Sequence, residues 1–156
     1  MDPFLGGGSI AHCDSDGLCK KVFSKGLTYP NGLTLGADGL IYVPSAITGE
    51  IKIFSLQQDN TLKEKALSIK VPYPVDNLSV DSKGNIWAAA FPSAQTWMKA
   101  TKNPHGIHPP TSAWRIRKLP GDYELVKVLE DDGSTLPGAT IVVHDAKIGR
   151  LFFGGE

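Results

Sequence analysis

Asn31-Gly32-Leu33-Thr34-Leu35 and, about 45 residues later, Asp76-Asn77-Leu78-Ser79-Val80 open two similar stretches of the chain. The openings are followed by Asp38-Gly39 and Ile41-Tyr42-Val43 in one case, and by Lys83-Gly84 and Ile86-Trp87-Ala88 in the other. Each stretch therefore reads as a strand, a glycine turn and a second strand. A strand-rich repeat of about 40–45 residues is typical of the blades of a β-propeller, a ring of small antiparallel sheets. The repeat places Asn31 and Asp76-Asn77 at equivalent positions, which in a propeller can be the central channel.

Short strands are expected along the whole chain, separated by turns rich in Gly, Asp and Asn. The expected strands are residues 9–13, 19–23, 32–35, 41–44, 51–56, 62–69, 78–80, 86–91, 113–119, 123–129, 140–143 and 151–153. No long stretch has a convincing helical period, so we expect an all-β fold. Grouped in fours, the strands give two complete antiparallel blades, 32–69 and 77–129, with parts of two others.

Two complete blades are too few to close a ring, because propellers have typically 4–8 blades. We therefore expect residues 1–156 to be a partial β-propeller domain, either part of a larger protein or a truncated product of one. Open sheet edges of this kind invite self-association. A complete small β-sandwich is the alternative.

The composition excludes several classes of partner. Lys plus Arg and Asp plus Glu number 16 each, so there is no electrostatic reason to expect nucleic acid or an anionic membrane. No apolar run approaches the roughly 20 residues that span a bilayer. The first residues lack the basic and apolar regions of a signal peptide, and the sequence leaves the compartment unknown.

Cys13 and Cys19 flank Asp14-Ser15-Asp16-Gly17 in an expected hairpin. They can form a disulfide in an oxidising compartment, but two cysteines do not fix the compartment, so the bonded and free states both remain open. The run Asp14-x-Asp16-Gly17 is similar to the start of a calcium loop but lacks its remaining oxygen ligands and its closing Glu. A plain turn is the better interpretation.

An insertion, residues 93–112, separates two strands of the second expected blade and contains Trp97, His105 and His108. In an up-and-down sheet it lies at the same end as Asn31 and Asp76-Asn77, so it is either a pocket wall or a mobile surface loop. The Pro- and Gly-rich surroundings of the two histidines disfavour a helix, and a zinc site is not expected there.

Several of these stretches together resemble the paraoxonase/arylesterase family, within a superfamily that includes gluconolactonase/regucalcin and strictosidine synthase-like propellers. The matching runs are Tyr29 to Leu33, Val75 to Asp81, Gly84 to Ala88, Ala113 to Ile116 and Asp132 to Thr140. The resemblance covers nearly the whole chain from about residue 8. It corresponds to the C-terminal half of the family's six-bladed propeller.

The resemblance implies a calcium-dependent hydrolase of lactones or aryl esters, in which calcium polarises the substrate carbonyl. Carried over by motif, Asn31, Asp76 and Asn77 would be calcium ligands. The family's other ligands, a Glu and an Asn, and its histidine base belong to blades upstream of this region. Phe91 stands where the family has a further active-site histidine, and His144 is expected to be structural. The catalytic residues of this chain are therefore unknown.

Two other functions remain open. One is a non-catalytic propeller-type binding module that uses Trp97 and the insertion to hold a ligand or partner. The other is a strictosidine synthase-like protein, with propeller chemistry other than hydrolysis.

Overall fold

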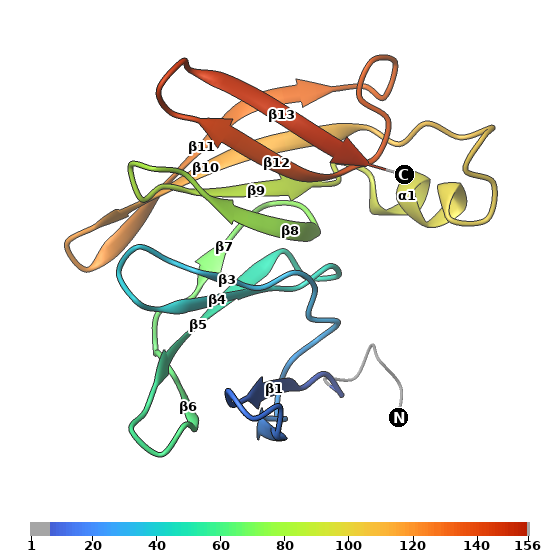
Figure 1. Ribbon diagram of the computed structural model, residues 1–156. Helices are drawn as coiled ribbons and strands as arrows, with labels where there is room; N and C mark the ends of the chain where they lie inside the picture. Colours follow the sequence, from blue (N-terminus) through green and yellow to red (C-terminus); the bar gives the residue numbers. More distant parts are fainter. Residues whose placement is uncertain (1–6, 156) are drawn as a thin grey trace.

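Antiparallel strands dominate the secondary structure of the protein, as a computed structural model that describes residues 7–155 shows (Figure 1). The all-β expectation is confirmed at this level. Within residues 7–155, no helix is long and apolar enough to cross a membrane.

The strands form three sheets and a separate hairpin. The first sheet contains β3 (Thr34–Leu35), β4 (Ile41–Pro44), β5 (Glu50–Leu56) and β6 (Leu62–Glu64) in that order, with β7 (Ile69–Lys70) also paired to β5. The second contains β8 (Val75–Val80), β9 (Ile86–Ala90), β10 (Thr111–Leu119) and β11 (Asp122–Asp131). The third contains β12 (Ala139–Asp145) and β13 (Arg150–Gly155), and β1 (Ile10–Cys13) pairs with β2 (Cys19–Phe23) in the hairpin.

One expectation about local structure was wrong. Residues 62–69 are not one strand, because the partner register on β5 shifts by two residues between Phe54↔Glu64 and Ile51↔Ile69. The two extra residues leave the ladder near Leu67, which is exposed, as in a β-bulge. The insertion also contains a helix, α1 (Ala94–Ala100), whose first turn is capped by the Ser93 side chain accepting from the Thr96 N–H at 3.1 Å.

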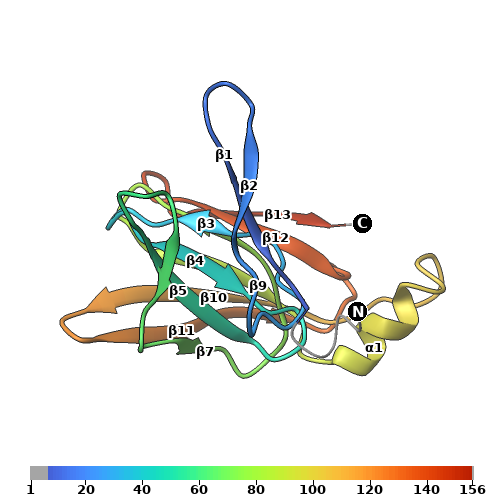
Figure 2. The same cartoon turned by 90° about the horizontal axis from the view of Figure 1, so that it is seen from below.

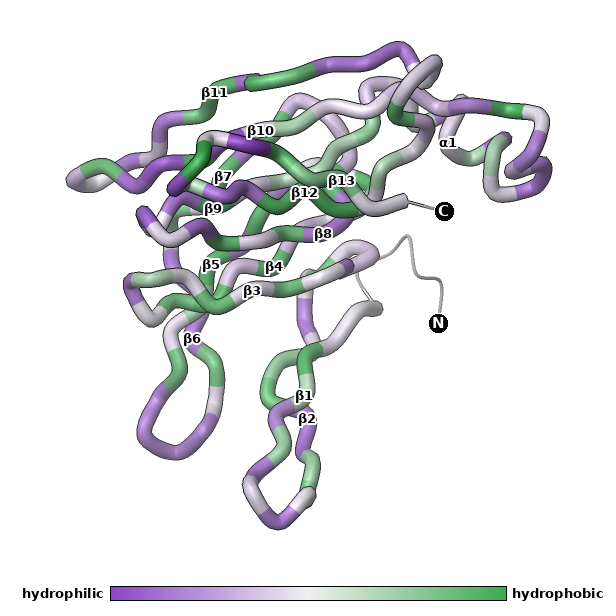
Figure 3. Tube along the Cα trace, turned by 45° about the horizontal axis from the view of Figure 1, so that its top comes forward, coloured by the Kyte–Doolittle hydropathy of each residue, from purple (hydrophilic) through white to green (hydrophobic). Residues whose placement is uncertain are grey.

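The three sheets stack face to face, and alternating residues of β9 fill both interfaces. Ile86, Ala88 and Ala90 pack toward the first sheet, in a cluster that includes Tyr42 and Ile53. Trp87 and Ala89 pack toward the third sheet, in a cluster with Val142. Because β-strand side chains alternate between faces, the small side chains of Ala88-Ala89-Ala90 let both neighbouring sheets approach closely. Apolar segments accordingly gather in the stacked strands, while the loop between β5 and β6 is hydrophilic (Figure 3).

A row of polar contacts joins the second sheet to the third. Asn77 Nδ2 donates to the Thr140 carbonyl at 3.0 Å and Ser79 Oγ donates to the Val142 carbonyl at 2.7 Å. At the end of the row, Asp81 Oδ2 lies 2.8 Å from His144 Nδ1. We call these three contacts between β8 and β12, with Asp81 just beyond β8, the polar seam.

The Asp81 carboxylate is the most buried charge of the seam, with a side chain that is 0% exposed. It also accepts from Trp87 Nε1 and Asn85 Nδ2, both at 3.0 Å. Burial by itself raises the pKa of Asp81, but hydrogen bonds from Trp87, Asn85 and His144 outweigh it and hold that pKa well below its usual value. The carboxylate is therefore ionised in the folded protein at neutral pH.

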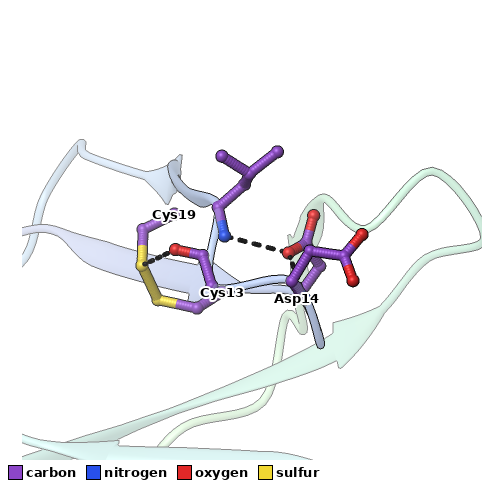
Figure 4. Close-up of a disulfide and its surroundings, with 6 residues drawn as sticks. Cys13, Asp14 and Cys19 are labelled. Carbon is purple, nitrogen blue, oxygen red and sulfur yellow. Dashed lines mark hydrogen bonds between the residues drawn. A yellow bond between two sulfur atoms is a disulfide. The ribbon is translucent and has the colours of Figure 1, made fainter.

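The β1–β2 hairpin projects away from the stacked sheets (Figure 2). Cys13 and Cys19 form a disulfide across it (Figure 4), so of the two states left open by the sequence the structure shows the bonded one. Asp14 Oδ1 accepts from the backbone N–H groups of Asp16 and Leu18 at 3.0 and 2.9 Å. The acidic run between the cysteines thus stabilises the turn that it forms.

We predict that Asp81→Asn lowers the free energy of unfolding at neutral pH by about 2–3 kcal/mol, because it removes hydrogen bonds to a charged, buried acceptor. The pKa of Asp81 is lower in the folded than in the unfolded chain, so its stabilisation is complete above the unfolded value of about 3.9 and is lost as pH falls toward the folded value. Urea unfolding at several pH values measures both effects.

The matched control is Asp16→Asn, the same change at an exposed turn residue. It should leave the pH dependence of stability as in the wild type. If the stability of Asp81→Asn falls with acid as steeply as that of the wild type, the lowered pKa of Asp81 in the folded protein is contradicted.

Candidate functional site

The loop before β3, which carries Asn31, is tied to the end of β4. Ser45 Oγ donates to the Thr28 carbonyl at 2.6 Å, and the Asn31 N–H donates to the Pro44 carbonyl at 3.1 Å. Between them Tyr29 has φ 44°, a left-handed conformation that is rare for an aromatic residue. The chain therefore turns sharply just before Asn31 and presents it at the edge of the first sheet.

The two similar sequence openings meet in space. A Cβ added to Gly32 would lie 2.0 Å from Asn77 Oδ1, so the Asn77 amide occupies the space that any other residue at position 32 would fill. Asn31 is the neighbouring residue, and its Oδ1 accepts from the Gly32 N–H at 3.0 Å. Gly32 is thus needed for close approach of the first and second sheets.

Asp76 and Asn77 lie together at the start of β8. Asn77 Nδ2 donates to Asp76 Oδ1 at 3.0 Å as well as to Thr140. Asp76 is only 6% exposed. The structure therefore brings all three candidate ligands to the same end of the sheets, with Asp76 and Asn77 in direct contact and Asn31 one residue from the Gly32 contact.

A cavity of about 320 Å³ opens beside Asp76. The insertion supplies one wall and the loop before β12 the other; the lining residues are Asp76, Trp97, Ala100, Thr101, Pro104, His105, Ile107, His108, Pro109, Pro137, Gly138 and Thr140. In Figure 1, α1 lies at the same end of the stacked sheets as the C-terminus. The insertion was expected to be either a pocket wall or a mobile surface loop, and in the structure it forms a wall of this cavity.

The α1 wall is fixed to the second sheet by aromatic stacking. The Trp97 ring stacks on the Phe91 ring with centroids 5.1 Å apart and planes 24° apart. Phe91 is fully buried directly after β9. Phe91 therefore supports the cavity wall.

The opposite wall is held by residues that the sequence interpretation did not single out. Asp131 Oδ1 accepts from the N–H groups of Gly133 and Leu136 at 2.9 and 3.0 Å, and such hydrogen bonds, that of Leu136 first, lower the pKa of Asp131. Buried Thr111 donates to the Leu136 carbonyl at 2.7 Å and accepts from the Ala139 N–H at 2.8 Å. The run Asp132-Gly133 was visible in the sequence as a turn, but its attachment to Thr111 depends on a contact distant along the chain.

The donor set at the three candidate ligands suits calcium, which takes 6–8 hard oxygen ligands. Asp76 offers a carboxylate, and Asn31 and Asn77 offer amide oxygens. In the part of the chain that the structure describes, no group of three or more His, Cys, Asp or Glu side chains could hold a metal ion. Two of the three candidate calcium ligands, Asn31 and Asn77, are asparagines. Their amide oxygens can bind calcium, but they are not among the His, Cys, Asp and Glu side chains that form such a group.

Comparison with known proteins assigns no family to the chain. No protein-family model matches it, and neither does any curated protein.

We predict that Gly32→Ala destabilises the protein by about 1–3 kcal/mol, because its new methyl group overlaps the Asn77 amide. In an Asn77→Ala background, which removes that amide, the same substitution should cost clearly less. Urea unfolding of the wild type, both single variants and the double variant measures this coupling. If the two substitutions change the free energy of unfolding additively, Gly32 and Asn77 are not in contact.

Proposed function

We propose that this chain carries the calcium-binding end and the substrate cavity of a calcium-dependent hydrolase of lactones or aryl esters, of the paraoxonase/arylesterase type. One observation carries the proposal: the Gly32–Asn77 contact brings Asn31 and Asp76-Asn77 to the same end of the sheets, where Asp76 lines a cavity. Oxygen ligands next to a cavity that can hold a substrate are what a metal needs to act on a bound carbonyl group.

The sheet topology supports the propeller part of the proposal. The first and second sheets each contain four consecutive strands paired in sequence order, as blades do, and β7 pairs with β5 at the edge of the first. β8, the first strand of the second sheet, contacts both β3 and β12, the first strands of its two neighbours. Sheets stacked with their first strands side by side are consistent with blades around a common axis, with the third sheet contributing two strands of a further blade.

Calcium would supply polarisation of the substrate carbonyl and stabilisation of the negative charge that develops on its oxygen. Asp76 would hold it through a carboxylate whose neighbour Asn77 is already oriented by Thr140. Asn31 and Asn77 would add neutral oxygens. These three residues supply fewer than the 6–8 ligands of a calcium ion, so water or further chain must complete the shell.

The partial ligand set favours a second candidate, a binding module that holds an ester or lactone without hydrolysing it. The cavity walls contain Trp97, Ile107 and several prolines, which suit an apolar ligand whether or not a reaction follows. The two candidate functions differ in whether the bound ester or lactone is hydrolysed.

We predict that calcium raises the melting temperature of the chain relative to a chelator, by about 5–10 °C when it is 100-fold above its dissociation constant. Asp76→Ala should abolish the shift, because it removes the charged ligand. Asp16→Ala is the control: it removes a carboxylate from the hairpin turn, the alternative calcium loop, and should keep the full shift.

Hydrolysis of phenyl acetate and of γ-butyrolactone then separates the two candidates. Calcium-dependent turnover that Asp76→Ala removes supports the hydrolase, whereas a calcium shift without turnover supports the binding module. A melting temperature that does not respond to calcium contradicts the proposed metal site.

A further inference from the structure

We propose that the end of the sheets opposite the candidate calcium ligands binds an anionic amphiphile, a carboxylate that carries an alkyl chain. The chain runs from Asn31 along β3 and from Asp76 along β8 to two glycine turns, residues 36–39 and 81–85. With the β10–β11 turn, these turns lie at the end of the sheets away from α1 (Figure 1). The inference goes beyond the proposed function and does not depend on calcium.

The two glycine turns border a cavity of about 340 Å³ between the first and second sheets. A Cβ added to Gly84 would lie 3.2 Å from the Ala37 Cβ, so the turns pack closely on each other. The buried side chains of Ile86 and Ile116 also line the cavity. A site formed by packed turns over an apolar lining exists before a ligand arrives, which lowers the entropic cost of binding.

A network of hydrogen bonds joins the two sheets beside this cavity. The Tyr42 hydroxyl donates to Asp38 Oδ2 at 2.8 Å and lies 3.0 Å from the Tyr123 hydroxyl. Lys118 Nζ donates to the same Asp38 oxygen at 2.6 Å. Burial by itself raises the pKa of Asp38, but hydrogen bonds from Lys118 and Tyr42 outweigh it and lower that pKa. Asp38 is therefore ionised at neutral pH and balances the charge of Lys118.

The cavity lining has a surplus of positive charge. Arg117 Nη2 lies 3.0 Å from Glu124 Oε1, so the charges of both Arg117 and Lys118 are balanced by carboxylates. None of the ion pairs within residues 7–155 includes Lys83, the third cation of the lining. One lining cation without a counterion matches a singly charged carboxylate better than a phosphate group, which carries nearly two charges.

The backbone at Lys83 is held in place by the turn itself. Asp81 Oδ1 accepts from the N–H groups of Lys83 and Asn85, both at 2.9 Å. The Lys83 side chain is exposed at the cavity. Its ammonium group can therefore meet an incoming anion, and a substitution at this position leaves the hydrogen bonds of the turn intact.

A second, more apolar cavity of about 260 Å³ adjoins the first, because Lys118 and Tyr123 line both. Leu67 and Leu119 line the second cavity and are 40% and 37% exposed. An alkyl chain that crosses from one cavity to the other would cover these leucines while its carboxylate faces Lys83. Removal of apolar surface from water favours such binding. An inorganic anion would leave the second cavity unused, and an alcohol would leave Lys83 without a counterion.

The first test is an NMR titration of the protein with octanoate in the presence of a calcium chelator. Amide signals of residues 36–39 and 81–85 should shift, whereas those of the insertion should not. Lys83→Gln should raise the dissociation constant about tenfold, the usual effect of losing a hydrogen bond between charged groups. Lys83→Arg should keep the affinity, and Lys21→Gln, which changes an exposed lysine of β2, should match the wild type.

Ligand controls separate the charge from the chain. Octan-1-ol and octylamine keep the chain without the negative charge, and acetate keeps the charge without the chain, so each should bind at least tenfold more weakly than octanoate. Shifts confined to the insertion and Asp76, or an unchanged affinity in Lys83→Gln, overturn the inference. Tighter binding of octyl phosphate than of octanoate overturns the assignment of a carboxylate. Because the chelator is present throughout, these results stand or fall separately from the proposed calcium site.

Discussion

Three side chains on one face of β8 and its following turn hold the second and third sheets in register, and the candidate site depends on them. Asn77 and Ser79 donate to backbone carbonyls of β12, and Asp81 pairs with His144 two residues further along each segment. Because residues two apart share a face of a strand, matching spacings on β8 and β12 satisfy all three groups together. Sliding either strand would leave buried polar groups without partners, which costs about 1–3 kcal/mol for each group.

The same seam explains how a cavity forms at one end of the sheets. Asn77 ends the seam where Gly32 allows the first sheet to approach, so candidate ligands from two sheets meet there. On the other side, the position of β12 fixes the loop that precedes it, and that loop clamps the insertion through Pro109. The far end of the seam is the hydrogen-bonded pair of Asp81 and His144, which contributes to stability. The candidate ligands and the buried Asp81 charge thus lie at opposite ends of one row of contacts.

Much of this arrangement follows from local sequence patterns. Alternation and glycine turns predicted most of the strands, and the repeat predicted that Asn31 and Asp76-Asn77 would share an end of the sheets. The helix α1 was missed because a helix of seven residues is too short to show a period. The contacts of Thr111 with residues 136 and 139, and of Asp81 with His144, join distant segments, which no local pattern encodes. Gly32 was expected to begin a strand, whereas its role in making room for Asn77 appears only in three dimensions.

The most direct test of the account is a crystal structure of the chain grown with calcium, with anomalous diffraction recorded to locate the ion. The account predicts an anomalous peak within about 2.3–2.6 Å of an Asp76 carboxylate oxygen and of the amide oxygens of Asn31 and Asn77, the distances that calcium keeps to oxygen. Crystals that contain calcium without a peak at these residues, or with one only at the hairpin turn around Asp14 and Asp16, would contradict it.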